Sequence, residues 1–141
     1  MRKRKIRVIV LGLVRHGDRV LLSEGYDSKL GSHYYRALGG GIDFGESSQD
    51  ALRREFQEEL RVELENIRYL GCSENLFCLE DEPGHEIVFA YQCDLCDRSL
   101  YEKSSIPYYE GHKEYQASWI EISELQSGIK RLVPEVFLSY L

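Results

Sequence analysis

The sequence predicts an α+β fold, in which a mixed or antiparallel β-sheet is flanked by helices as an α/β/α sandwich. Segments of strand length outnumber helical ones, the clearest helix lies in the middle of the chain, and a second helical pattern closes it. Because a sheet buries its apolar face against another layer, we expect the helices to cover it. With 141 residues, the chain has the length of one domain, residues 1–141.

The first two strands are predicted at residues 5–14 and 19–25. Both are rich in branched aliphatic residues, and the sequence RHGD between them is typical of a hairpin turn. Residues 26–33 are polar and contain glycine, which predicts a loop. Residues 34–38 are predicted as a short strand that runs into a loop of three glycines.

The clearest helix is predicted at residues 47–61, SSQDALRREFQEELR. Ser47 is a candidate N-cap, with Asp50 three residues later as a weaker capping-box partner. Leu52, Phe56 and Leu60 recur every four residues, which predicts an apolar stripe that faces the core.

The second half of the chain predicts a long antiparallel hairpin, with strands at 65–77 and 86–94 and a turn at 79–85. A polar, tyrosine-rich loop is expected at 97–113, followed by a strand at 115–122. The sequence SEL then starts a helical turn, and VPEVFLSYL predicts a C-terminal helix with Pro134 in its first turn.

Acidic residues crowd the central helix. At 100° per residue, Glu55, Glu58 and Glu59 share one arc of about 100° beside the apolar stripe. A solvated acidic face is one interpretation, because charge-rich helices are common. The other is a cation site, since the preceding glycines allow close backbone approach and three carboxylates suit Mg²⁺ or Mn²⁺.

The spacing of these residues resembles the motif of the Nudix (MutT-like) hydrolase family. Gly40 is followed by Glu46 after five residues and by Arg54-Glu55 after seven more; Phe56, Glu58-Glu59 and Val62 complete the pattern. Eight of nine defined positions match over 23 residues. Arg61 stands where the family has a glycine, which predicts either a strained left-handed residue or a longer helix.

The resemblance implies the Nudix fold and a divalent-metal hydrolase. Glu55, Glu58 and Glu59 would be metal ligands, with the Gly40 carbonyl as a further one, and a Glu46–Arg54 salt bridge would orient the site. The cofactor would be Mg²⁺, with Mn²⁺ as the alternative; it would neutralise the substrate and lower the pKa of a bound water.

The general base stays open at this stage. Glu55 is one candidate, and Glu110 or Glu114 in the predicted loop is the other, with Glu86 as a weaker third. Candidate substrate contacts are Arg36, which could reach a phosphate, and the aromatic side chains of Tyr34, Phe77 and Tyr109, which could stack on a base or belong to the core instead.

The resemblance therefore predicts hydrolysis of a pyrophosphate bond in a nucleoside diphosphate linked to another group, such as a nucleotide, a nucleotide sugar or a related metabolite. A Nudix-fold sensor that binds nucleotides without turnover is the alternative, although such modules normally have a degraded motif. Family members are often dimers, so a homodimer is one expected assembly.

The net charge of the chain limits the classes of binding partner. The net charge of −6 argues against general binding to nucleic acid or membrane surfaces. It is uneven, however: residues 1–36 carry +6 and residues 37–141 carry −12. The apolar run near the start is broken by Arg7 and has no cleavage pattern, so we expect a cytoplasmic protein. The resemblance implies that its partner is a small molecule.

Four cysteines raise the alternative of a structural zinc site. Cys93 and Cys96 lie three residues apart in a predicted strand region, where such residues point to opposite faces, whereas a zinc cage needs them to converge. We therefore expect free, partly buried thiols.

Overall fold

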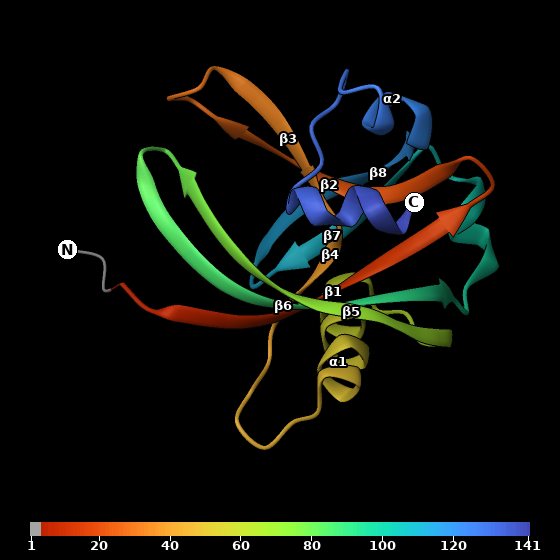
Figure 1. Ribbon diagram of the computed structural model, residues 1–141. Helices are drawn as coiled ribbons and strands as arrows, with labels where there is room; N and C mark the ends of the chain where they lie inside the picture. Colours follow the sequence, from red (N-terminus) through yellow and green to blue (C-terminus); the bar gives the residue numbers. More distant parts are fainter. Residues whose placement is uncertain (1–3) are drawn as a thin grey trace.

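The computed structural model describes residues 4–141 as a strongly curled mixed sheet with helices on both sides (Figure 1). The strands are β1 (Ile6–His16), β2 (Arg19–Asp27), β3 (Ser32–Arg36), β4 (Leu38–Gly41), β5 (Leu64–Leu79), β6 (Glu82–Leu95), β7 (Ser105–Glu110) and β8 (Lys113–Glu121). The helices are α1 (Ser48–Leu60), α2 (Ile122–Gln126) and the 3-10 helices Arg98–Glu102 and Glu135–Tyr140.

The main sheet order is β5-β6-β1-β2-β8-β7, with β3 added to β2 and β4 added to β1. β1 pairs with β6 in parallel, from Ile6 opposite His85 to Val14 opposite Cys93, whereas the other pairs are antiparallel. The predicted mixed α+β fold is therefore confirmed. In Figure 1, α1 covers one side of the sheet, while α2 and the C-terminal 3-10 helix lie on the other.

Strand β1 builds both cores, because its side chains alternate between faces. Val10 and Val14 belong to the cluster that packs under α1, whereas Ile9, Leu11 and Leu13 belong to the cluster that contains α2 and the C-terminal 3-10 helix. At Gly12, a Cβ would lie only 2.9 Å from side-chain atoms of Leu52 and Phe56. The glycine therefore lets α1 approach β1 closely.

Helix α1 forms as the sequence predicts. The Ser47 side chain accepts a hydrogen bond from the Asp50 backbone N–H at 3.1 Å, which caps the helix. Leu52 and Phe56 are fully buried. The helix ends at Leu60, and Arg61 takes up the left-handed conformation with φ of 55°. The first of the two expectations for Arg61 is thus confirmed.

Two predictions in the first half of the chain are wrong. The expected loop at residues 26–33 is only the turn at residues 28–31, because β2 runs to Asp27 and β3 starts at Ser32. The three glycines are not a loop but part of β4, where Gly39, Gly40 and Gly41 face Leu11, Val10 and Ile9 of β1.

Other predictions in the second half need correction. The β5–β6 turn is shorter than expected and consists of Glu80 and Asp81, both at positive φ. The expected loop at 97–113 contains the 3-10 helix Arg98–Glu102 and strand β7, and the C-terminal helix is of the 3-10 type. The four cysteines are free thiols, with Cys93 buried and the other three exposed.

No helix in the described part of the chain, residues 4–141, has the length and apolar character needed to cross a membrane.

Candidate active site

A cleft of about 630 Å³ opens between α1, β4, the start of β1 and the β7–β8 hairpin. Ile9 and Leu11 form part of its floor. The three motif carboxylates from α1 line one part of it. Arg7 and Arg36 also line the cleft, so that cationic and anionic groups face the same space.

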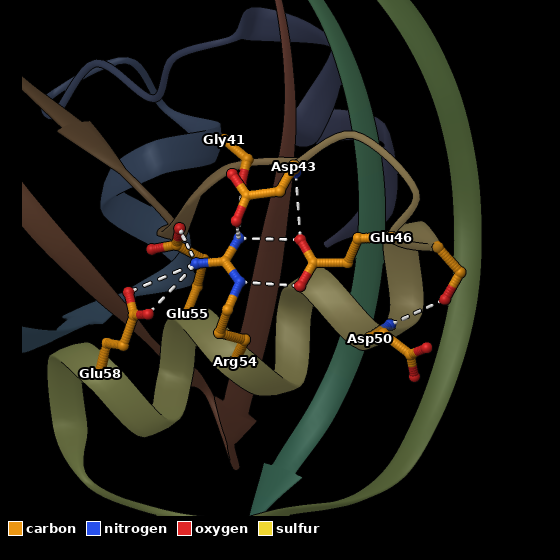
Figure 2. Close-up of polar contacts among 8 residues, drawn as sticks. Gly41, Asp43, Glu46, Asp50, Arg54, Glu55 and Glu58 are labelled. Atoms are coloured by element: carbon orange, nitrogen blue, oxygen red, sulfur yellow. Dashed lines mark hydrogen bonds and ion pairs between the residues drawn. The ribbon is translucent and has the colours of Figure 1, made fainter.

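Arg54 is the centre of the polar network beside this cleft (Figure 2). It contacts Glu46 through two parallel bonds, Nε to Oε2 at 2.7 Å and Nη2 to Oε1 at 2.9 Å. The Arg54 guanidinium holds the pKa of Glu46 at about 2, well below the usual range, and the Asp43 backbone N–H acts in the same direction. The geometry of the predicted Glu46–Arg54 salt bridge is therefore present.

Arg54 also binds the helix carboxylates and the preceding strand. Its Nη1 donates to Glu55 at 2.9 Å and to Glu58 at 3.3 Å, and its Nη2 donates to the Gly41 carbonyl at 2.9 Å. One guanidinium thus joins three parts of the motif: β4, the loop that carries Glu46, and α1. A planar side chain with five donors can make these contacts at once, which a lysine ammonium cannot.

Gly40 faces the carboxylate of Glu55. A Cβ at this position would lie 2.5 Å from Glu55 Cδ and Oε2, so only glycine leaves the carboxylate its place. Burial raises the pKa of Glu55, and Arg54 opposes this effect. The glycine at this position of β4 therefore leaves room for an acidic side chain to lie against the backbone of the strand.

Glu59 is the most buried of the three motif carboxylates, with 5% of the residue exposed. Its Oε1 has no hydrogen-bond partner among the described residues. Burial raises the pKa of Glu59 to about 8, and the nearby carboxylate of Glu55 adds to this rise. A buried carboxylate with an unused oxygen is costly, so the site stores unfavourable energy that a cation would relieve.

The three carboxylates line the same cleft, but within residues 4–141 no group of three or more His, Cys, Asp or Glu side chains is arranged to hold a metal ion. Arg54 pairs with Glu55 and Glu58, while the Oε1 of Glu59 has no hydrogen-bond partner among the described residues. The donors are all oxygens and fit a hard cation such as Mg²⁺. Binding would require Glu55 and Glu58 to turn from Arg54 toward the cation.

The structure separates the candidate bases. Glu110 lines the cleft and lies close enough to Glu59 to raise its pKa. Glu114 is not among the residues that line the cleft, and its carboxylate accepts a hydrogen bond from the Tyr109 hydroxyl at 3.1 Å. Glu86, the weaker third candidate, is 2% exposed, binds Arg36 and does not line the cleft, which argues against a role as the base.

The candidate substrate contacts are also divided. Arg36 and Tyr109 line the cleft, whereas Tyr34 and Phe77 line a second cavity of about 570 Å³, which meets the cleft at Arg36. Sequence reasoning missed Arg7, although its alternation with Ile9 and Leu11 could have revealed it, because all three share one face of β1.

Arg61, at the end of α1, does not line the cleft but contacts Tyr109, which does. Its guanidinium carbon lies 4.9 Å from the centroid of the Tyr109 ring, in a cation–π arrangement. Tyr109 and Glu110 both line the cleft. The residue that replaces the motif glycine therefore connects the helix end to the β7–β8 hairpin.

Comparison with known families gives one match over most of the chain: the NUDIX domain, residues 3–138. The NAD(P)H pyrophosphatase NUDT13, mitochondrial, of Mus musculus is 41% identical over 131 residues, which cover 87% of this chain and 32% of that protein. The NAD-capped RNA hydrolase NudC of Pseudomonas syringae pv. tomato is 37% identical over 67 residues, which cover 48% of this chain and 23% of that protein. The chain thus spans a third or less of the length of these relatives.

Solved structures share the fold at low sequence identity. A NUDIX hydrolase from Nitrosomonas europaea matches with a TM-score of 0.64 and 18% identity, over 96% of this chain and 87% of that one. A MutT NUDIX hydrolase from Burkholderia pseudomallei matches with a TM-score of 0.62 and 19% identity, over 85% of this chain and 86% of that one. The curled sheet with α1 on one face is the shared feature.

Proposed function

This chain belongs to the Nudix family, and on that premise we propose that it hydrolyses the pyrophosphate bond of a nucleoside diphosphate linked to another group, with Mg²⁺ or Mn²⁺ as cofactor. The observation that carries the proposal is Glu59, a buried carboxylate in the same cleft as Glu55 and Glu58, one oxygen of which has no hydrogen-bond partner within residues 4–141. A bound cation would relieve this cost, and the nearly complete motif favours an enzyme over a sensor without turnover, in which the motif is normally degraded.

The proposed ligands are Glu55, Glu58 and Glu59, with the Gly40 carbonyl as a further candidate. Glu46 is no ligand in this scheme. It keeps Arg54 in place, and Arg54 orients Glu55 and Glu58 until the cation and substrate arrive. When bound, the divalent cation would neutralise the diphosphate and supply an activated water.

In the reaction, the oxygen of a water molecule forms a bond to one phosphorus while the bridging bond between that phosphorus and the anhydride oxygen breaks. The leaving phosphate departs with the bridging oxygen, and a carboxylate takes the proton of the water. Glu55 and Glu110 are the two proposed bases, because both line the cleft. Arg36 is proposed to bind an anionic part of the substrate.

The relatives suggest which substrates to test first. One is described as an NAD(P)H pyrophosphatase and the other as an NAD-capped RNA hydrolase, and both names denote a diphosphate that joins two nucleosides. We propose a dinucleotide diphosphate of this type as the substrate class. The tyrosines and the second cavity beside Arg36 offer room and stacking surface for such a molecule.

The experiment is a hydrolysis screen with Mg²⁺ over NADH, ADP-ribose, nucleotide sugars, dinucleoside polyphosphates and nucleoside triphosphates, with Glu58→Gln as the test variant. We expect turnover of at least one diphosphate and a loss of about 100-fold or more in the variant, because a charged ligand is removed. Glu63→Gln is the matched control: this exposed glutamate follows the helix and lies outside the cleft.

The alternative, a nucleotide sensor, makes a different prediction. It would bind ADP-ribose or NADH in a calorimetric titration with Mg²⁺ and leave it intact after prolonged incubation. Turnover that disappears in Glu58→Gln but persists in Glu63→Gln excludes the sensor. The single-domain extent, cytoplasmic location and homodimer stay predictions.

A further inference from the structure

Arg7, Arg36 and Glu86 form an ion triad at one side of the cleft. The Arg36 Nη2 lies 3.2 Å from both carboxylate oxygens of Glu86, and the Arg7 Nη1 lies 3.8 Å from its Oε2. The Asn75 side chain donates to the same carboxylate at 3.3 Å. The Glu86 side chain is only 3% exposed, so the carboxylate holds both guanidinium groups from beneath.

Two guanidinium groups over one carboxylate leave a net positive charge. Arg36 uses a single nitrogen for Glu86, although the group carries five N–H donors. Arg7 makes only a long ion pair, and its side chain is 49% exposed. With respect to residues 4–141, most donors of the pair are therefore free for a ligand, and buried Glu86 restricts where they lie.

The triad lies away from the motif carboxylates. Arg7 is paired with Glu86 in the β1–β6 register, whereas Gly40, which faces Glu55, is paired with Val10. Three residues along a strand separate the two points by about 10 Å. The cleft thus has an acidic end for a cation and a basic end for an anion.

A smaller cavity of about 170 Å³ continues from the basic end. Arg7 and Arg36 line both spaces, and Arg4 and Lys5 line the smaller one, together with the acids Glu82 and Glu86. Four cationic side chains against two carboxylates make this cavity positive, in a chain whose net charge is −6.

We propose that Arg7 and Arg36, positioned by Glu86, bind a phosphate group on a ribose of the substrate, outside the diphosphate that is cleaved. The inference rests on the proposed function for the identity of the site. An arginine pair with free donors matches the planar, bidentate recognition of phosphate oxygens. The class of ligand is a dinucleotide diphosphate whose adenosine carries a 2′-phosphate or a 3′-phosphodiester.

The kinetic test compares NADPH with NADH, which differ by one 2′-phosphate. We expect a higher kcat/KM for NADPH in the native protein, and we expect Arg7→Gln to lower the NADPH to NADH ratio about five- to tenfold, mainly through KM. Arg19→Gln is the matched control, because Arg19 has the same 49% exposure and a similar 3.9 Å ion pair with Glu121, yet lines no part of the cleft.

Arg36→Gln should have the larger effect on the ratio, but it also removes the main partner of buried Glu86. The test of the proposal is therefore Arg7→Gln. An unchanged ratio in Arg7→Gln, or a change of equal size in Arg19→Gln, would overturn the proposal. Equal kcat/KM values of the native protein for NADPH and NADH would also overturn the proposal, provided that the binding test below shows no added affinity from the phosphate.

The binding test does not depend on turnover. Calorimetric titrations compare AMP with adenosine 2′,5′-bisphosphate and adenosine 3′,5′-bisphosphate. Tighter binding of the 2′-phosphate compound, lost in Arg7→Gln, supports a phosphorylated dinucleotide; tighter binding of the 3′ compound supports a capped RNA. Equal binding of all three refutes the phosphate site. If no dinucleotide is hydrolysed, the proposed activity is refuted. These titrations would still show whether Arg7 and Arg36 bind a ribose phosphate.

Discussion

Arg54 binds Glu46 through two parallel bonds of 2.7 and 2.9 Å while its remaining nitrogen contacts Glu55 and Glu58. Glu46, which lies outside the helix, therefore fixes the orientation of the Arg54 guanidinium. The guanidinium in turn orients the carboxylates of Glu55 and Glu58. We expect Arg54→Lys to lower kcat at least tenfold with little change in the unfolding midpoint, since a lysine cannot span these partners. Steady-state kinetics and thermal unfolding measure both quantities.

The control for this change is Arg53→Lys on the same helix. Arg53 donates to the Leu64 carbonyl at 3.3 Å and does not line the cleft. Equal losses of activity in the two variants would mean that Arg54 acts only by general stabilisation of α1.

The Glu46 carboxylate makes a further prediction about acid stability. Its pKa is about 2 in the folded protein against an ordinary value of 4.5, because Arg54 binds the charged form. The lowered folded pKa means that this contribution is complete above about pH 4.5 and is lost as the pH falls toward 2. We expect the native protein to exceed Glu46→Gln in urea midpoint at pH 6, with the difference shrinking steadily from pH 4.5 to pH 2.5. A difference that is constant over this range would contradict the assignment.

Gly40 and Gly41 differ sharply in the space beside them, although both lie in β4 and line the cleft. A Cβ on Gly40 would meet the Glu55 carboxylate at 2.5 Å, whereas a Cβ on Gly41 would have no atom within 4 Å. We expect Gly40→Ala to lower kcat about 100-fold by displacing Glu55, and Gly41→Ala to keep most of the activity. Both variants are compared by kcat and, for folding, by circular dichroism. Similar losses of kcat in Gly40→Ala and Gly41→Ala would show that the conformational freedom of the glycine backbone, and not the space for Glu55, is what activity requires.

Local patterns predicted α1 and its acidic arc because capping, helical periodicity and motif spacing all act within a few turns. They did not predict β4, since three glycines have weak strand propensity. The strand forms because a Cβ on Gly39 would lie 2.0 Å from the Val10 carbonyl, so only glycine allows this approach to β1. Strand β7 lies in the segment that was predicted as a polar, tyrosine-rich loop. It contains Pro107, which is tolerated because β7 is the last strand in the sheet order and therefore an edge.

The Arg7–Glu86–Arg36 triad was beyond local reasoning altogether. Its members come from β1, β6 and β3, and they meet because β1 pairs in parallel with β6. A register between strands so far apart in the chain depends on the whole sheet. Arg36 was a candidate phosphate contact from its place before the glycines, whereas Glu86 was considered only as a weaker third candidate for the base, because its burial could not be foreseen.

Arg61 tests how a non-glycine residue is tolerated at the end of α1. The left-handed conformation costs an arginine about 1–2 kcal/mol, and the cation–π contact with Tyr109 returns about 0.5–1 kcal/mol. We expect Arg61→Gly to match or exceed the native stability, and Arg61→Ala to be less stable than Arg61→Gly by about 1 kcal/mol, since both variants lose the contact but only alanine keeps the strain. Urea unfolding of the three proteins measures these differences, and an alanine variant as stable as the glycine variant would contradict the conformational cost.

Glu59 connects stability with cation binding. The Oε1 of buried Glu59 has no hydrogen-bond partner among residues 4–141, and burial raises the pKa of this carboxyl to about 8. Glutamine replaces it with a neutral group and avoids the costly charged form, so we expect Glu59→Gln in EDTA to be at least as stable as the native protein. With Mg²⁺, the native protein should gain several degrees in unfolding temperature, whereas Glu59→Gln should gain little, because binding to the folded state alone raises stability. Glu63→Gln, outside the cleft, should respond as the native protein does. If Glu59→Gln gained as much from Mg²⁺ as the native protein, the buried carboxylate would not be a ligand, and the cation would bind through Glu55 and Glu58 without it.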